Sequence, residues 1–213
     1  MRINEQERKE AVEEIYLILA EFYKFPDEDF YEEVADGSLE NRLKELYHIA
    51  GYHDPNFTLS NRFSSLAEMK KNYMYCFLGG SALYAPPVES LYKIWTTDPS
   101  VDMAMANQKG YLFGDAALHM NHLFKHYQIE VPKDYENMPD HLTLLLEFLA
   151  FILKNETDTV IRQYLFDHFD WLGDFKTELS KVENSSFYQD VTEIVIQAVD
   201  DERKWLEQKD FIS

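Results

Sequence analysis

Apolar residues recur at helical spacing along most of the chain, and residues that cap or stop helices separate the repeats. In the first segment the apolar positions repeat every three or four residues from Ala11 to Phe22, which predicts an amphipathic helix. Asn4 and Glu7 have the spacing of a capping box at its start, and Pro26 lies just beyond its end. The sequence therefore predicts a first helix that ends before Pro26.

Glycine, proline and capping residues place the boundaries of the helices that follow. The predicted segments are residues 27–37, 38–51, 60–80 and 114–129, a helix that carries Pro139 in its first turn, and two or three helices after residue 157 with breaks near Gly173 and residues 184–186. Alternating strand patterns are essentially missing. The sequence therefore predicts an all-α fold, a bundle of roughly nine to twelve helices with a long proline-containing loop, in a single domain over residues 1–213.

One helix and one loop stand out from this pattern. The stretch HLTLLLEFLAFIL, residues 141–153, is so apolar that we expect it to be the buried central helix. Residues 79–100 carry Pro86 and Pro87 and are predicted to be irregular chain with at most one helical turn. Because the prolines fix their own φ angles, the loop should hold its shape at low entropic cost.

The proline loop carries more apolar side chains than a solvated linker needs: Tyr84, Val88, Leu91, Tyr92 and Trp95. Glu89 and Ser90 add groups that can form hydrogen bonds, and Glu89 can attract a cation. Such a loop could present a platform for a peptide, or it could fold back over the core with its aromatic rings buried. The residues alone leave both interpretations open.

A second group of polar residues opens the apolar helix. Asp140 and His141 follow Pro139 in the predicted first turn, where exposed N–H groups favour a carboxylate and disfavour a charged imidazole. Glu147 lies seven residues after Asp140, so both carboxylates can share one helix face. These groups could line a cleft; alternatively, Asp140 caps the helix and Glu147 forms a satisfied buried pair.

The charge of the chain narrows the choice of partners. Asp and Glu number 39 against 20 Lys and Arg, which gives a formal net charge of −19. Such a surface repels the phosphates of nucleic acids and anionic lipids, and it favours a basic peptide or protein segment. The same acidity could serve solubility alone.

The cysteine content and the lack of long apolar runs indicate in which cellular compartment we expect the protein. The chain holds one cysteine, Cys76, which excludes a disulfide within the chain and a cysteine-based zinc site. No run of 18 uncharged apolar residues is present, and the stretch MRINEQERKE at the start is charged where a secretory signal would be apolar. We therefore expect a soluble cytoplasmic protein without stable membrane insertion.

One helix face offers a competing interpretation. It carries a carboxylate and three imidazoles at intervals of four, three and four: Asp115, His119, His122 and His126. This spacing could hold a divalent metal, but an apolar stripe lies opposite, so the face could equally be the solvent side. Ser90 lacks the glycines of a nucleophile elbow, and the chain has no glycine-rich phosphate loop. No catalytic residue, metal or cofactor is therefore assigned.

Three motifs stand in order between about residues 70 and 205. The first is YMYCFLGGSALYAPPVESLY, with the key positions Tyr73, Phe77, Gly79, Ala85, Pro86, Pro87, Glu89, Ser90 and Tyr92. The second is PDHLTLLLEF, with the key positions Pro139, Asp140, His141, Leu142, Leu146, Glu147 and Phe148. The third is a His-x-x-Trp spacing followed by an aromatic pair, at His168, Trp171, Phe187 and Tyr188. In this order the motifs resemble those of the TorD/DmsD (NarJ-like) family of redox-enzyme maturation chaperones.

The resemblance implies a cytoplasmic, system-specific chaperone that is not an enzyme. Members of this family bind the twin-arginine signal peptide and the apo form of a molybdoenzyme of the dimethyl sulfoxide or trimethylamine oxide reductase type. They assist cofactor insertion and proofreading before export, and they occur as monomers and as domain-swapped dimers. The resemblance implies neither a cofactor of the chaperone's own nor nucleic acid as a partner. A generic helical interaction scaffold is the remaining alternative.

The same resemblance assigns residues to a peptide site. A twin-arginine leader is a cationic stretch followed by an apolar one, so its complement is a cleft with carboxylates beside apolar surface. We therefore expect the proline loop and the start of the apolar helix to meet in space. The expected signal-peptide and partner-binding residues are Tyr73, Phe77, Pro86, Pro87, Glu89, Ser90, Tyr92, Asp140, His141 and Glu147.

Overall fold

The computed structural model describes residues 4–53 and 57–210, and its regular secondary structure is helical. The elements in chain order are α1 (Glu5–Glu21), α2 (Glu28–Asp36), α3 (Ser38–Ala50), α4 (Leu66–Phe77), the 3-10 turn η1 (Glu89–Leu91), α5 (Asp115–His126), the 3-10 turn η2 (Lys133–Tyr135), α6 (Leu142–Asn155), α7 (Asp158–His168), α8 (Leu172–Leu179) and α9 (Ser186–Asp210). The all-α class is confirmed. Over the described residues the helix count lies at the bottom of the predicted range, and it falls below that range if the short α8 is left out. None of the described helices is both long enough and apolar enough to cross a membrane.

Capping residues that the sequence identified begin and end the first helices. The side chain of Asn4 accepts a hydrogen bond from the N–H of Gln6 at 3.1 Å, and that of Asp27 accepts one from the N–H of Phe30 at 2.9 Å. Gly37 ends α2 in a left-handed conformation, with φ of +81°, which a residue with a side chain rarely adopts. These three predicted boundaries are confirmed.

The predicted start of the fourth helix is wrong. α4 begins at Leu66 and not near residue 60, because the side chain of Ser65 caps it by accepting a hydrogen bond from the first turn. The predicted break near Gly173 is confirmed, because α7 ends at His168 and α8 begins at Leu172, with Gly173 as the second residue of α8. The break near residues 184–186 is confirmed by the start of α9.

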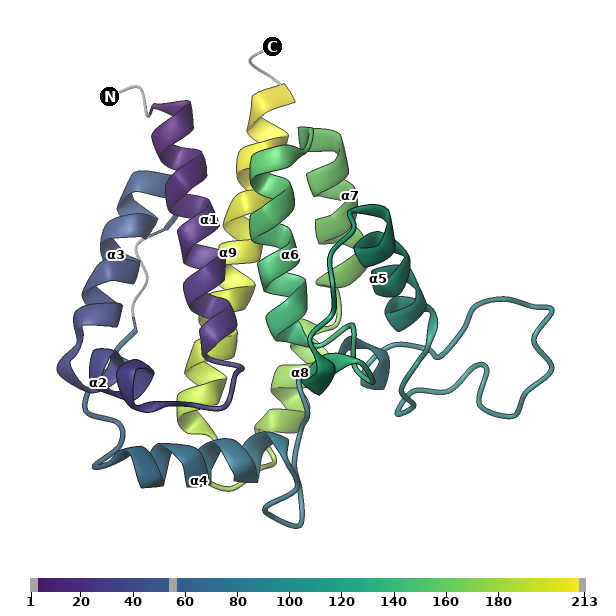
Figure 1. The fold of residues 1–213 in the computed structure, drawn as a ribbon, viewed down its shortest axis with the longest axis horizontal. Helices are drawn as coiled ribbons and strands as arrows, with labels where there is room; N and C mark the ends of the chain where they lie inside the picture. The colour runs from purple at the N-terminus through teal and green to yellow at the C-terminus, as the bar shows by residue number, and fades with distance from the viewer. Residues whose placement is uncertain (1–3, 54–56, 211–213) are drawn as a thin grey trace.

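α6 is the central helix of the bundle, as its apolar sequence predicted. It packs against α1 and α7, and α1 also packs against α3. Figure 1 shows α3, α1 and α6 as neighbours, with α4 crossing below them. The side chains of α6 from Leu142 to Leu146 are all buried, so the start of this helix is enclosed by protein.

A buried ion pair joins α1 to α9. A guanidinium nitrogen of Arg8 lies 2.5 Å from a carboxylate oxygen of Glu202, and the hydroxyl of Tyr52 donates a hydrogen bond to the same carboxylate at 2.7 Å. The guanidinium also lies over the ring of Trp205, 3.8 Å from its centroid. Because buried charges need such partners, this group fixes α1 against α9. No spacing in the sequence predicted a pair between residues so far apart.

The connection between α4 and α5, residues 78–114, contains the turn η1 and is otherwise irregular, which confirms the prediction for residues 79–100. Figure 1 shows it leaving α4, passing the bundle near α8 and then extending away from the body before it reaches α5. Its proline segment is anchored, because the N–H of Ala85 donates a hydrogen bond to the carbonyl of Cys76 at 2.7 Å.

Candidate functional site

The proline loop and the start of α6 meet, as the sequence predicted. Val88 and His141 form an antiparallel β-bridge, and the N–H of Glu89 donates a hydrogen bond to the carbonyl of Asp140 at 3.1 Å. We call this region the loop–helix junction and define it by Val88, Glu89, Ser90, Asp140 and His141.

Asp140 is the buried anchor of the loop–helix junction. Its carboxylate is 0% exposed and accepts hydrogen bonds from the N–H of Ser90, at 2.7 Å, and from the hydroxyl of Ser90. Burial raises the pKa of Asp140, and the hydrogen bonds from Ser90 oppose that shift. Because α6 begins at Leu142, the expectation that Asp140 lies in the first turn of the helix is wrong. Asp140 fastens the loop instead.

His141 is the N-cap of α6, so its predicted place in the first helical turn is also wrong. Its Nδ1 accepts a hydrogen bond from the N–H of Thr143 at 3.3 Å, and its ring packs against that of Tyr135 with centroids 4.9 Å apart. Burial lowers the pKa of His141 to about 3, so the imidazole is neutral near pH 7. The side chain therefore acts as a neutral cap.

Glu89 lies at the centre of a network of hydrogen-bonded polar side chains. Its Oε2 is 2.7 Å from Nδ1 of His168, and its Oε1 is 3.2 Å from the ammonium of Lys93. Nε2 of His168 in turn lies 2.9 Å from Nδ1 of His119, and the two rings are stacked. Burial raises the pKa of Glu89, whereas His168 and Lys93 act in the opposite direction. This network thus extends from the core to the exposed side chain of His119.

The aromatic residues of the predicted site belong to the core. Tyr73, Phe77 and Tyr92 are all buried, and the rings of Tyr73 and Phe77 meet edge to face with centroids 5.0 Å apart. The hydroxyl of Tyr92 donates a hydrogen bond to the carbonyl of Pro86 at 3.0 Å. Pro87 is buried and Pro86 is half-buried. For these residues the structure agrees with the interpretation that the loop folds over the core.

Glu147 lies apart from the loop–helix junction. Its carboxylate pairs with Lys24, just after α1, at 2.7 Å, and both side chains are half-buried. The expectation that Glu147 shares a helix face with Asp140 is wrong, because Asp140 precedes α6. Glu147 instead borders a cavity of about 250 Å³ whose other walls are mainly apolar side chains.

The metal alternative relied on four side chains of α5 and its start: Asp115, His119, His122 and His126. Within the described parts of the chain, no group of three or more His, Cys, Asp or Glu side chains is arranged to hold a metal ion. His119 turns toward His168, and Asp115 accepts a hydrogen bond from the N–H of Thr97 at 3.0 Å. The geometry gives no support to this alternative.

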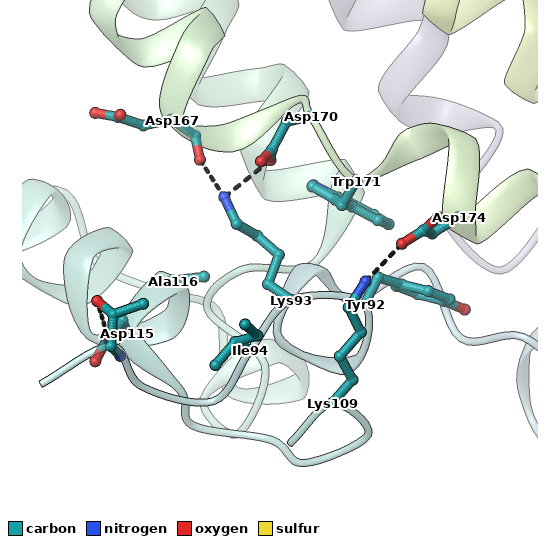
Figure 2. A pocket seen from close by; sticks show the side chains of 11 residues that line it. Tyr92, Lys93, Ile94, Lys109, Asp115, Ala116, Asp167, Asp170, Trp171 and Asp174 are labelled. Atoms are coloured by element: carbon teal, nitrogen blue, oxygen red, sulfur yellow. Dashed lines mark hydrogen bonds and ion pairs between the residues drawn. The ribbon is translucent and has the colours of Figure 1, made fainter. Parts of the chain in front are cut away.

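An open cavity of about 510 Å³ is shown in Figure 2. It lies next to the loop–helix junction, because Lys93 in its wall lies 3.2 Å from the carboxylate of Glu89. Two lysines of the α4–α5 connection reach into it from one side, and the carboxylates of Asp170 and Asp174, with the backbone carbonyl of Asp167 at the end of α7, face it from the other. The ammonium of Lys93 lies 2.8 Å from Asp170, and that of Lys109 lies 2.7 Å from Asp174. We call this the acidic cavity and define it by Tyr92, Lys93, Lys109, Asp170, Trp171 and Asp174.

The acidic cavity has an aromatic wall. The rings of Tyr92 and Trp171 are stacked, with centroids 5.3 Å apart and planes 15° from parallel. The indole N–H of Trp171 donates a hydrogen bond to the carbonyl of His168 at 2.8 Å, which holds the ring against the end of α7. Because Tyr92 is 7% and Trp171 is 2% exposed, this ring pair forms the packed backing of the cavity.

The sequence patterns did not predict the acidic cavity. Its walls come from residues 92–116 and 167–174, and only the second segment carries a usable signal. There Asp167, Asp170 and Asp174 recur at intervals of three and four, which is typical of one helix face. That spacing could have indicated an acidic surface, but not the lysines opposite it.

Comparison with known families matches residues 27–177 to the family described as nitrate reductase delta subunit, which is more than half of the chain. Among solved structures, one described as a redox enzyme maturation protein from Archaeoglobus fulgidus has a TM-score of 0.53 and is 21% identical in sequence. The similarity covers 92% of this chain and 93% of that chain. At this level of identity the likeness concerns the fold.

Curated relatives carry chaperone names. Chaperone protein TorD of Shewanella pealeana is 25% identical over 148 residues, which cover 69% of this chain and 64% of that protein. A protein named probable Tat proofreading chaperone DmsD, of Haemophilus influenzae, is 28% identical over 130 residues, which cover 61% of this chain and 57% of that protein. The chain thus spans less than two thirds of the length of these curated relatives.

Proposed function

The chain belongs to the nitrate reductase delta subunit family, and from this membership we propose that it is a cytoplasmic, system-specific chaperone for a molybdoenzyme. It binds the twin-arginine signal peptide and the apo form of that enzyme, which is of the dimethyl sulfoxide or trimethylamine oxide reductase type. It assists cofactor insertion and proofreading before export. We propose further that the chain acts as one domain, without a catalytic residue or cofactor of its own.

The names of the relatives support this role. TorD is named a chaperone protein, and DmsD is named a Tat proofreading chaperone. The region that matches the family, residues 27–177, includes the loop–helix junction and the acidic cavity. The two regions most relevant to peptide binding therefore lie in the part of the chain that the family shares.

The observation that carries the proposal is the acidic cavity beside the loop–helix junction. A twin-arginine leader is cationic and then apolar, so it needs carboxylates next to apolar or aromatic surface. Asp170 and Asp174 are 58% and 61% exposed in this cavity, and Ile94, which is 46% exposed, supplies apolar surface beside them. The net charge of −19 adds a long-range attraction for a cationic segment.

We propose that the residues of the expected site serve peptide binding in two ways. Pro86 and Glu147 are half-buried, so they reach solvent and can touch a bound peptide. The others hold the proline loop against α6 and position the surface around it: Tyr73, Phe77, Pro87, Glu89, Ser90, Tyr92, Asp140 and His141. Buried groups of this kind act through the conformation of the loop.

Calorimetric titration of the full chain with a synthetic twin-arginine leader tests the proposed function. We expect a saturable complex that weakens as salt is added, because salt screens charge attraction over about 8 to 10 Å at ordinary ionic strength. A matched peptide with both arginines replaced by glutamine should bind at least about tenfold more weakly. If no twin-arginine leader binds to the chain while circular dichroism shows it folded, the proposal is wrong.

A further inference from the structure

The acidic cavity holds more carboxylates than ammonium groups. Three aspartates line it with their carboxylates, against two lysines: Asp115, Asp170 and Asp174 against Lys93 and Lys109, while Asp167 contributes its carbonyl oxygen. Each lysine already occupies the position that a cation would take. Lys93 lies 2.8 Å from Asp170 and 2.7 Å from the carbonyl oxygen of Asp167, and Lys109 lies 2.7 Å from Asp174, as Figure 2 shows.

The buried carboxylate of Glu89, behind the cavity, is also stabilised by a nearby positive charge. Glu89 is 0% exposed, and its Oε1 has no hydrogen-bond partner within the described residues. That oxygen faces the ammonium of Lys93 at 3.2 Å. Although burial disfavours the charged form of Lys93, the carboxylates of Asp170 and Glu89 outweigh that effect and raise the pKa of Lys93. The inner end of the cavity is therefore built around a cation.

The two lysines differ in how firmly they are held. The side chain of Lys93 is 29% exposed and has three oxygen partners, so it is part of the wall. The side chain of Lys109 is 54% exposed, and its one carboxylate partner, Asp174, is 61% exposed. Exposed pairs of this kind are weak because water and salt screen them. Lys109 can therefore be displaced while Lys93 stays in place.

We propose that the acidic cavity binds the arginine side chains of a cationic peptide, and that Lys109 is a built-in competitor that leaves Asp174 when the peptide arrives. This inference rests on the proposed function, because it takes the twin-arginine segment of the leader as the occupant. The volume of about 510 Å³ lies within the range typical of ligand sites. The cavity thus assigns the cationic part of the leader to a place outside the loop–helix junction.

The chemistry of the cavity favours arginine over other cations. Asp170 and Asp174 are four residues apart around the start of α8, and each presents a planar carboxylate that a guanidinium can bind through two parallel hydrogen bonds. Tyr92 and Trp171 are 7% and 2% exposed, so their stacked rings support the cavity wall, and the preference for arginine rests on the two carboxylates. A lysine from the chain itself satisfies the charge of Asp174 but not this bidentate geometry.

The rim of the cavity suits the apolar part of the same leader. Ile94 lines the cavity and is 46% exposed. Leu112 and Phe113, just before Asp115 in the cavity wall, are exposed as well. A segment that is cationic and then apolar would meet exposed carboxylates and the exposed side chain of Ile94 in the same cavity.

Charge-changing variants in the acidic cavity test this inference by calorimetric titration with the twin-arginine leader. Asp174→Asn should weaken binding at least fivefold, because it removes an arginine partner. Lys109→Met should tighten binding about threefold, because it frees Asp174. Lys181→Met is the matched control: Lys181 pairs with Glu178 at 2.6 Å, is similarly exposed and does not line the cavity, so binding should be unchanged. Equal affinity of wild type, Asp174→Asn and Lys109→Met would overturn the cavity assignment while leaving the proposed function intact.

A second arm tests the cavity independently of the leader. The capped dipeptide Ac-Arg-Arg-amide is titrated while the indole N–H signals of the tryptophans are followed by NMR. We expect the signal of Trp171 to shift in wild type and to shift less in Asp174→Asn, with Trp205, which packs over Arg8 in another part of the molecule, as the unaffected reference. Equal shifts of Trp171 and Trp205, or equal shifts in wild type and variant, would overturn the assignment even if the leader binds.

Discussion

The loop–helix junction and the acidic cavity use the same kinds of residue but differ in their access to water. In the junction, Asp140 is fully buried and its hydrogen bonds come from Ser90 within the chain. In the cavity, Asp174 is mostly exposed and its partner Lys109 is exposed too. The carboxylate of Asp140 therefore holds the fold, whereas the carboxylate of Asp174 is exposed to solvent.

The difference teaches that a motif residue need not contact the ligand. Asp140 and Glu89 belong to the motifs that resemble the chaperone family, yet both are buried by contacts inside the chain. Asp174 and Lys109 belong to none of those motifs and face an open cavity. Residues that fix the loop and residues that face the open cavity are thus separable, and variants can distinguish them.

The largest expected effect comes from removing the carboxylate of Asp140 from the loop–helix junction. Asp140→Ala removes the acceptor of two hydrogen bonds from Ser90 and leaves both donors buried, so it should lower the free energy of unfolding by about 3 kcal/mol or more. Asp174→Ala, the matched change in the cavity, should alter it by less than about 0.5 kcal/mol. Urea unfolding followed by circular dichroism at pH 7.5 measures both. Equal effects would break the comparison between the regions.

A smaller effect should appear as a pH dependence of the junction. Burial lowers the pKa of His141 from 6.5 to about 3, so between these values the unfolded chain binds a proton that the folded chain rejects, and stability falls as pH falls through this window. From pH 6.5 to pH 5.0 the loss is about 2 kcal/mol, at about 1.36 kcal/mol per pH unit. His141→Asn keeps a capping side chain but cannot titrate, so it should lack this part of the loss.

The comparison of wild type with His141→Asn isolates the histidine from other groups. Burial also raises the pKa of Asp140 and Glu89, which acts in the opposite sense: those groups stabilise the fold as pH falls, because the folded chain binds their protons more readily. These contributions are common to both proteins and cancel in the difference. Urea unfolding at pH 7.0, 6.0 and 5.0 gives that difference, and a constant value across the series would contradict the assigned role of His141.

The smallest expected effect separates the two lysines of the cavity. Lys93→Met removes the cation that faces the buried Oε1 of Glu89 and should lower the free energy of unfolding by about 1 to 2 kcal/mol. Lys109→Met breaks an exposed pair and should change it by less than about 0.5 kcal/mol. Methionine keeps much of the apolar stem in both variants. Thermal and urea unfolding of the pair check this, and equal stability would mean that Lys93 is as dispensable as Lys109.

Local signals predicted much of the fold. Asn4, Asp27 and Gly37 begin or end helices where their side chains or their freedom of φ predicted, and the apolar stretch of α6 is buried at its centre. These signals are readable because capping and helical periodicity depend on residues within about one turn. The start of α4 was misplaced, because the sequence offers serines at positions 60, 64 and 65 and only the side chain of Ser65 caps the helix.

The candidate site was predictable only in part. The meeting of the proline loop with α6 followed from the motifs, and the structure confirms it through the bridge between Val88 and His141. The role of Asp140 was misplaced, because whether it caps a helix or holds a loop depends on Ser90, 50 residues away. The acidic cavity was missed for the same reason, since its lysines and aspartates come from separate segments.

By itself the sequence determined the helical class, the acidic surface and the stiff proline loop, because composition and short-range spacing encode them. Only the tertiary structure decided which carboxylates are buried and which reach water. That choice depends on partners far along the chain, such as His168 for Glu89, 79 residues apart, and Lys109 for Asp174, 65 residues apart. The periodicity of apolar residues predicts which helix face is buried, but it does not predict which carboxylate is buried with a distant partner.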